Sequence, residues 1–298
     1  MNDGLAQDRA QHLARTRTVR RSQMRVLSMV AIYSMLTAGA FVLLMPFFWM
    51  ISTSLKKQWE AYKFPPVWIP AQPQWSNYVQ ALTLAPFGLY FLNTVRIALV
   101  TVLGTLLSCS LAAYAFSRLR APGRDLIFLV LLGTMMLPYT VTMVPVFILF
   151  SRLGWVNSFK PLMVPAFFGN AYYIFLLRQF FLTIPRELEQ AARIDGCNSF
   201  RIYWNIVLPL SLPALATVAI FQFMDSWNDF LGPLIYLRDE NLRTVAVGLA
   251  YFAGSSRVGP QMHLMMAAAF VALLPELLLF FLAQRFFIQG IVFTGVKG

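Results

Sequence analysis

The chain has 298 residues, of which 58% are hydrophobic and only 12% are charged, and its net charge is +12. Soluble domains carry about 25% charged residues, so this chain has too little polar surface to cover a water-exposed globule. The composition excludes a cytosolic enzyme, a secreted disulfide scaffold and a disordered regulator. It indicates a membrane protein, in which Lys and Arg are placed by side of the membrane.

Six apolar runs follow one another along the chain, and a spanning helix needs about 20 mostly apolar residues. Backbone polar groups in hydrocarbon must be satisfied internally, so each run is predicted to be a helix. The predicted fold is an all-α polytopic membrane protein with six transmembrane helices over residues 26–287, between a basic N-terminal tail (1–25) and a C-terminal tail (288–298). The runs are Val26–Leu55, Ile97–Ser117, Leu126–Ser151 (interrupted by Pro138 and Pro145), Pro161–Leu177, Ile202–Met224 (with Pro209 and Pro213) and Leu264–Gln284.

Basic residues predict the orientation. If the N-terminus is cytoplasmic, 15 of the 24 Lys and Arg residues fall in inside segments and 9 in outside segments, and six of the 15 precede the first run. The positive-inside rule therefore predicts that both termini are cytoplasmic.

Cysteines and histidines are few. Cys109 falls within the second run and Cys197 in a cytoplasmic loop, so free thiols are expected. His12 and His263 have no Cys or carboxylate cluster beside them, which argues against a metal site. The sequence has no phosphate-binding glycine loop and no nucleophile elbow, so neither catalytic residues nor ATP hydrolysis by this chain are expected.

The loop between the fourth and fifth runs, residues 185–209, carries helix signals. Pro185 and two glutamates suit a first turn, Gly196 is expected to end the helix, and Ser199 is expected to cap a second helix. The loop is thus predicted to be a rigid helical projection into the cytoplasm.

Two uses of the projection remain open from the residues alone. A face of small residues suits docking of a soluble partner, whereas an aromatic face suits a helix lying on lipid headgroups. The first face consists of Leu188, Ala191 and Ala192, and the second of Phe200, Tyr203, Trp204 and Val207.

The spacing of Gln190, Ala191 and Ala192 with Gly196 and a later Leu208–Pro209 resembles the EAA loop of ABC importer permeases. This chain has Gln190 where the family pattern has Glu, which removes one charge. Further stretches resemble the shorter, six-span permease of carbohydrate importers of the maltose and glycerol-phosphate type. They are Ile51–Lys56, Pro65–Pro70, Asn93–Thr94, Ala113–Arg118, Trp227–Phe230 and Gly295–Gly298.

The resemblance implies a heterodimer with a second permease, a dimer of ATP-binding cassette ATPases, an extracellular solute-binding protein and a sugar substrate, in a bacterial or archaeal cell membrane. ATP would be used by the partner ATPase, with no cofactor bound by this chain. The loop would couple ATPase closure to alternating access. Arg193 and Glu189 would offer peripheral charge pairs, and Phe200, Tyr203 and Trp204 would pack the loop onto the bundle. The implied coupling residues are Glu187, Glu189, Gln190, Ala191, Ala192, Arg193, Asp195, Gly196, Ile206, Leu208 and Pro209.

Polar residues within the runs are candidates for a translocation path, because a sugar needs hydrogen-bonding groups and aromatic faces. The alternative is that they hydrogen-bond helices to one another. The candidates are Thr134, Tyr139, Thr142, Asn170, Tyr172, Tyr173, Gln222, Asn228 and Glu276.

Glu276 is a carboxylate inside a predicted span, where a charge costs about 2.5–3.5 kcal/mol on insertion scales. Either it contacts substrate or a cation of the partner, or it lies near the cytoplasmic edge.

Two rival functions are a secondary transporter and an integral membrane lipid-modifying enzyme. The first is expected to carry more intramembrane charges, and the second a cluster of His, Asp or Glu at the membrane edge. The acidic pairs Asp225/Asp229 and Asp239/Glu240 are expected outside the membrane.

Overall fold

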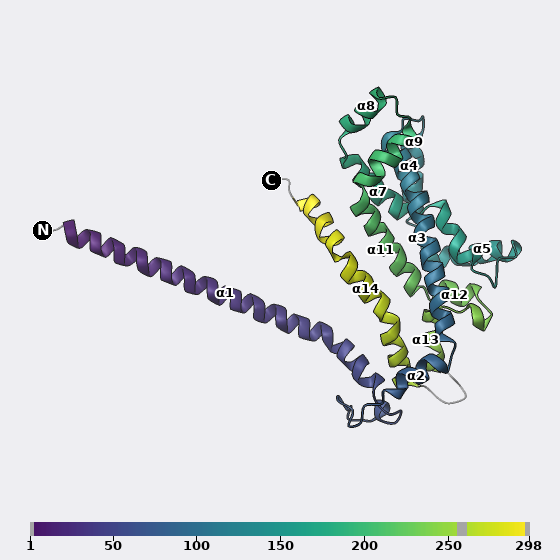
Figure 1. The fold of residues 1–298 in the computed structure, drawn as a ribbon, viewed down its shortest axis with the longest axis horizontal. Coiled ribbons are helices and arrows are strands. Elements are labelled where there is room, and N and C mark those ends of the chain that lie inside the picture. Colours follow the sequence, from purple (N-terminus) through teal and green to yellow (C-terminus); the bar gives the residue numbers. More distant parts are fainter. Residues whose placement is uncertain (1–2, 255–260, 296–298) are drawn as a thin grey trace.

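The structure, a computed structural model, describes the backbone of residues 3–254 and 261–295 and the side chains of residues 27–250, 252 and 261–284. Every regular element in these ranges is helical, which confirms the all-α class. Residues 1–2 of the predicted N-terminal tail and 296–298 of the C-terminal stretch lie outside the described residues. Figure 1 shows a bundle of helices from which one long helix, α1, projects.

The projecting helix α1 runs from Asp3 to Ser54. Its apolar part, Leu27–Ser54, corresponds to the first predicted span, Val26–Leu55, and none of its most apolar window is buried. The helix approaches the bundle at its C-terminal end, near α2 (Ser76–Thr83) and α14 (Met262–Gly295) (Figure 1). The predicted basic tail is helical from Asp3 and continues directly into this span.

Helix α3, Phe87–Arg118, is the central element of the bundle and packs against α7 (Ala171–Thr183) and α11 (Leu212–Asn228). It begins ten residues before the predicted run Ile97–Ser117. The extension is stable because its polar residues have partners: Asn93 Nδ2 donates to the carbonyl of Asn241 at 2.8 Å, and the guanidinium of Arg96 lies 6.0 Å from the centre of the Phe159 ring.

Two predicted spans are sharply bent where prolines interrupt them. Helices α4 (Arg124–Thr134) and α5 (Tyr139–Arg152) meet at 99°, next to Pro138. The segment Ser199–Leu210 meets α11 (Leu212–Asn228) at 78°. Both bends fall beside prolines that the sequence shows in these runs, Pro138 in the first and Pro209 and Pro213 in the second.

The fourth predicted span, Pro161–Leu177, is not one helix in the structure. The chain forms α6 (Lys160–Met163), a 3₁₀ turn η2 (Val164–Phe168) and then α7 (Ala171–Thr183). The break falls where Gly169 has a φ of +90° and Asn170 caps α7 by accepting from two backbone N–H groups. Within the described residues, length and composition alone identify three spans, or five if each bent pair is one span.

The remaining elements are the long helix α14 and several short helices, which lie near the end of the bundle where α1 enters it (Figure 1). Helix α14 (Met262–Gly295) contains the last predicted span, Leu264–Gln284, and packs against α2, α13, α11 and α1. One apolar cluster joins α3, α7, the 185–209 loop and α11, and a second joins α2, α3, α13 and α14. The short elements are η1 (Glu60–Tyr62), α2 (Ser76–Thr83), α12 (Leu231–Tyr236), η4 (Glu240–Leu242) and α13 (Val245–Gly254).

Candidate functional site

The 185–209 loop forms a helical projection at one end of the bundle, beyond the ends of α7 and α3 (Figure 1). Helix α8 runs from Arg186 to Ile194. Gly196 has a φ of +80°, and its N–H and that of Cys197 donate to the carbonyls of Arg193 and Ala192 at 3.0 and 2.9 Å. This is the Schellman arrangement that closes a helix with a left-handed glycine.

The second part of the projection begins at α9, Ser199–Ile202, and continues through a π turn, η3 (Tyr203–Val207), and α10 (Leu208–Leu210). The predicted cap at Ser199 is wrong by one residue. Asn198 is the cap, because its Oδ1 accepts from the N–H of Arg201 at 2.8 Å. Hydrogen bonds thus cap both helical parts at the turn between them.

Helix α8 has one buried and one exposed face. Glu189 and Ala192 are buried against the bundle. Gln190, Ala191 and Ile194 face away, and Ile194 is 87% exposed. The expectation that Glu189 forms a peripheral charge pair is wrong, because its carboxylate lies 3.0 Å from the guanidinium of Arg118 with only 8% of its side chain exposed. The other predicted coupling residues on the exposed side are Glu187, Arg193, Asp195, Gly196 and Pro209, while Ile206 and Leu208 are half-buried.

The three aromatic residues of the 185–209 loop that were considered above lie in two different environments. Tyr203 is buried, its hydroxyl lies 2.7 Å from Ser110 Oγ, and its ring lies 5.2 Å from that of Tyr114. Phe200 and Trp204 are 64% and 55% exposed and stack on each other with ring centres 6.3 Å apart. The expected packing onto the bundle therefore holds for Tyr203 and is wrong for the other two.

A cavity of about 970 Å³ lies among α3, η2, α11 and the starts of α5 and α12. Four of the predicted path residues line it: Tyr139, Asn170, Gln222 and Asn228. Its lining does not include Thr134 or Thr142, whose hydroxyls donate to carbonyls of their own chain segments, nor does it include Tyr172. The structure therefore brings together four of the nine predicted residues in this cavity.

Hydroxyl and amide groups form a continuous chain along one wall of this cavity. Thr101 Oγ1 lies 2.8 Å from Ser226 Oγ, to which Gln222 Nε2 donates at 3.0 Å. Thr105 Oγ1 donates to Gln222 Oε1 at 3.1 Å. These residues join α3 to α11 and also line the cavity, so the same side chains bond the two helices together and line the cavity.

Two carboxylates, Asp225 and Asp229, also line the cavity, although the sequence analysis did not name them as path candidates. Asp225 accepts a hydrogen bond from the hydroxyl of Tyr173 at 2.6 Å, and Asp229 accepts from the N–H of Gly232 at 3.0 Å. A signal was available, since residues 222, 225 or 226, and 229 follow the i, i+3/i+4, i+7 spacing of one helix face.

Glu276 lies in α14 beside a smaller cavity of about 140 Å³ that it shares with Asn228. Asn228 Nδ2 donates to Glu276 Oε1 at 2.5 Å, so the carboxylate contacts a residue of the large cavity. Asn228 also lines the large cavity, and Glu276 is therefore one residue removed from it.

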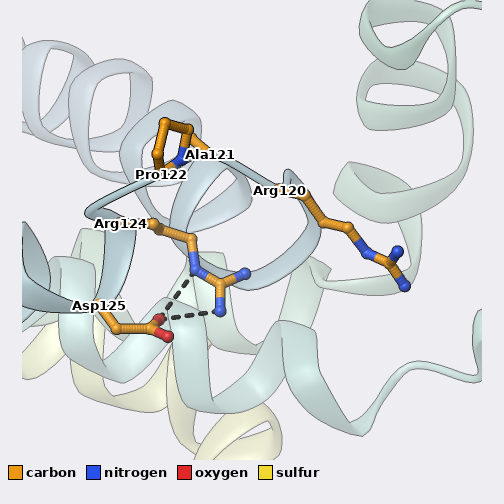
Figure 2. Close-up of a pocket in the computed structure, with 5 residues that line it drawn as sticks. All are labelled: Arg120, Ala121, Pro122, Arg124 and Asp125. Atoms are coloured by element: carbon orange, nitrogen blue, oxygen red, sulfur yellow. Dashed lines mark hydrogen bonds and ion pairs between the residues drawn. The ribbon is translucent and has the colours of Figure 1, made fainter.

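Another shallow cavity, of about 340 Å³, lies at the turn between α3 and α4. Figure 2 shows Arg124 directed toward Asp125, with Arg120 pointing away from both. Arg124 Nη2 lies 2.8 Å from Asp125 Oδ1, and 78% of the Asp125 side chain is exposed. This pair is a surface feature of the α3–α4 turn and is separate from the polar cavity.

Apolar helices that border a half-open cavity with polar lining residues, with a helical projection at one end, are consistent with a membrane transport protein. Residues 104–292 match the family described as "Binding-protein-dependent transport system inner membrane component", and the chain belongs to this family. The resemblance to importer permeases is thereby confirmed.

Similar proteins of known class and a solved structure agree with this family assignment. The chain is 35% identical to the arabinooligosaccharides transport system permease protein AraQ of Halalkalibacterium halodurans, over 87% of this chain and 93% of AraQ. It is also 35% identical to the sn-glycerol-3-phosphate transport system permease protein UgpE of Pectobacterium atrosepticum, over 87% and 94%. A chain of a bacterial ABC transporter involved in the import of alginate superposes with a TM-score of 0.78 at 25% identity, covering 88% of this chain and 97% of that one. These relatives are transport permeases and not enzymes, which excludes the lipid-modifying enzyme.

Proposed function

We propose that this chain is one of the two permease subunits of an ATP-driven, binding-protein-dependent sugar importer. The observation that carries the proposal is that one helix, α3, reaches both functional regions. Its middle contributes Thr101 and Thr105 to the polar cavity, and its last residue, Arg118, is bonded to the projection.

The cavity supports a sugar substrate by its chemistry. Its lining offers hydroxyl, amide and carboxylate groups together with the ring of Tyr139. Sugar hydroxyls both donate and accept hydrogen bonds, so such a wall replaces the water that the sugar loses. The named relatives transport arabinooligosaccharides and glycerol 3-phosphate, and the proposed substrate class is therefore a sugar or a related polyol.

The path of the chain supports six crossings with both termini on the cytoplasmic side. The proposed crossings are α1, α3, the bent pair α4–α5, the broken segment α6–α7, the bent segment α9–α11, and α14. Figure 1 shows α3, α7 and α14 directed toward the end that carries α8, and α11 directed away from it. The excess of basic residues in the same segments agrees with a cytoplasmic position for the projection.

The proposed coupling surface is the exposed face of α8. In this mechanism, closure of a dimeric ATPase on ATP displaces α8, and the helices around the cavity then open it to the outside, where a solute-binding protein delivers the sugar. ATP is used by the ATPase, and this chain and a second permease enclose the path in a bacterial or archaeal cell membrane. A solved alginate transporter is in complex with a periplasmic protein bound to an alginate pentasaccharide; that structure shows a chain of the same fold with such a partner.

A test combines purification and transport. An affinity-tagged chain purified from its own cell membrane should bring with it an ATP-binding cassette ATPase and a second permease. Sugar uptake into vesicles that contain the complex should stop when the ATPase is inactivated. Uptake that persists with an inactive ATPase would contradict the proposal.

A pair of variants tests the coupling surface. Ala191→Arg places a large side chain on the exposed face of α8, and Ala121→Arg places the same side chain on the exposed α3–α4 turn. We expect the first variant to lose the co-purified ATPase and the second to retain it. Equal retention of the ATPase by both variants would show that α8 is not the docking face.

A further inference from the structure

One guanidinium group joins three helices at the end of the bundle that carries the projection. Arg118 is the last residue of α3, and its Nε lies 3.0 Å from Oε1 of Glu189 in α8. Its Nη2 donates to the carbonyl of Ile184 at 2.7 Å and to the carbonyl of Phe181. These carbonyls belong to the end of α7, so α3, α7 and α8 meet at a single side chain.

The group is buried, which makes the contact specific. The side chains of Arg118 and Glu189 are 2% and 8% exposed. A buried charge that loses its partner is strongly destabilised, because water cannot replace the partner. The carbonyls at the end of a helix also lack intrahelical donors and favour a nearby cation. Any displacement of α8 that separated the two charges would therefore be opposed, and α3 is drawn along instead.

The other buried residue of α8 supplies no comparable restraint. Ala192 packs in the apolar cluster of the bundle, where contacts are non-directional and a small side chain can slide. The ion pair, by contrast, depends on the positions of both charged groups. The exposed face of α8 is free of this contact, since Ala191 and Gln190 point away from the bundle.

Helix α3 extends this connection to the cavity. Thr105 precedes Arg118 by 13 residues, which corresponds to about 20 Å of α-helix. Thr101 and Thr105 line the cavity and bond to Ser226 and Gln222 of α11. A displacement of the C-terminal end of α3 would thus be transmitted to the hydrogen-bonded wall of the cavity.

We propose that Arg118 and Glu189 are positioning residues that transmit displacement of α8 to α3 and so to the cavity wall. The inference rests on the proposed function, in which an ATPase displaces α8. It assigns to an intrachain ion pair a role in coupling that is distinct from the docking of the ATPase on the exposed face. A purely structural pair would stabilise the chain without altering how much sugar is moved per ATP.

The experiment measures sugar transported per ATP hydrolysed by the complete complex in proteoliposomes. Glu189→Gln keeps the size of the side chain and removes its charge. We expect ATP hydrolysis to continue while transport per ATP falls about tenfold, within the range by which single substitutions alter coupling between sites. The matched control is Arg124→Gln with Asp125→Asn, which removes an exposed ion pair of the same end of the bundle (Figure 2) and should leave the ratio within about twofold because such pairs contribute little.

Three outcomes overturn the inference. The first is a Glu189→Gln complex whose transport per ATP is within about twofold of the unmodified complex. The second is a parallel loss of hydrolysis and transport in an assembled complex. The third applies if Glu189→Gln does not assemble: the ratio is then measured on Arg118→Lys, which keeps both charges and changes the geometry, and an unchanged ratio there contradicts the role. If the unmodified complex shows no ATP-driven uptake, the proposed function fails instead.

Discussion

Gly248 lies in α13, where that helix contacts α3, and the structure leaves no room there for a methyl group. A Cβ at this position would lie 2.5 Å from Cδ2 and 2.9 Å from Cε2 of Tyr90, whereas carbon atoms in contact are about 3.5–4.0 Å apart. Tyr90 has little space to move, because it is 1% exposed, its ring lies 5.7 Å from that of Phe87 and its hydroxyl donates to Glu240 at 3.3 Å. Gly248→Ala must therefore displace a buried ring or the helix.

The expected loss follows from two opposing effects. Overpacking a filled core typically costs about 1–3 kcal/mol, and an overlap of about 1 Å relative to a normal carbon contact places this case near the upper value. Replacing Gly by Ala in a helix stabilises the helix by up to about 1 kcal/mol. The free energy of unfolding is therefore expected to fall by about 2 kcal/mol. Gly88→Ala is the matched control, since a Cβ at Gly88 in the first turn of α3 meets nothing within 4 Å.

The assay is thermal unfolding of the purified protein in detergent, followed by loss of helical circular dichroism. One kcal/mol shifts the unfolding temperature of a domain of 150–250 residues by about 2–4 °C. We therefore expect Gly248→Ala to unfold about 4–8 °C below the unmodified protein, and Gly88→Ala to unfold at the same temperature or slightly higher. Equal unfolding temperatures for the two variants would refute the packing argument.

Three other substitutions give sharp expectations. Gly196→Ala introduces a Cβ into open space at a φ of +80°, so only the backbone cost of about 1–2 kcal/mol applies, measured as a lower unfolding temperature. Tyr173→Phe removes the 2.6 Å hydrogen bond to Asp225 and should reduce sugar uptake while the complex still assembles in size-exclusion chromatography. Burial lowers the pKa of Lys56 below 10.5, against the attraction of Glu60, so the charged form is disfavoured in the folded state. Stability should therefore rise relative to Lys56→Met as pH increases through the lowered pKa toward 10.5, and unfolding temperatures that change in parallel from pH 7 to pH 10 would contradict this.

Long-range burial of charge could not be read from the sequence. The sequence favours a peripheral position for Glu189, because neighbouring residues of the loop are also charged. Its partner, Arg118, precedes it by 71 positions, and the periodicity of one helix carries no information about the other. The same reason explains why the sequence does not identify Asp225 as a lining residue, since its hydrogen-bond partner Tyr173 stands 52 positions earlier in α7.

Helix ends and bends are easier to predict from the sequence than buried ion pairs, because they depend on the backbone preferences of single residues such as Gly and Pro. Gly196 has the left-handed φ that ends α8, and Pro138 lies at the 99° bend between α4 and α5. For the fourth run, Pro161–Leu177, the prediction of one continuous helix is wrong. Apolar composition favours a helix throughout, whereas Gly169 ends the first part and Asn170 caps a new helix, α7. A glycine followed by a good capping residue was the available signal for that break.

The buried side of α3 is visible in the sequence once the solvent is taken to be lipid. In water an apolar row marks the core, but lipid is as apolar as leucine, so close helix contacts are marked by small and hydroxyl-bearing residues instead. Along α3 such residues recur every four positions and all are at most 3% exposed, whereas a row of leucines with the same spacing is 46–59% exposed. The small row ends next to the charge that binds Glu189, so one face of one helix contains the cavity wall, the packing surface and the contact with the projection. The buried row is Thr101, Thr105, Cys109, Ala113 and Ser117, and the exposed row is Leu99, Leu103, Leu107 and Leu111.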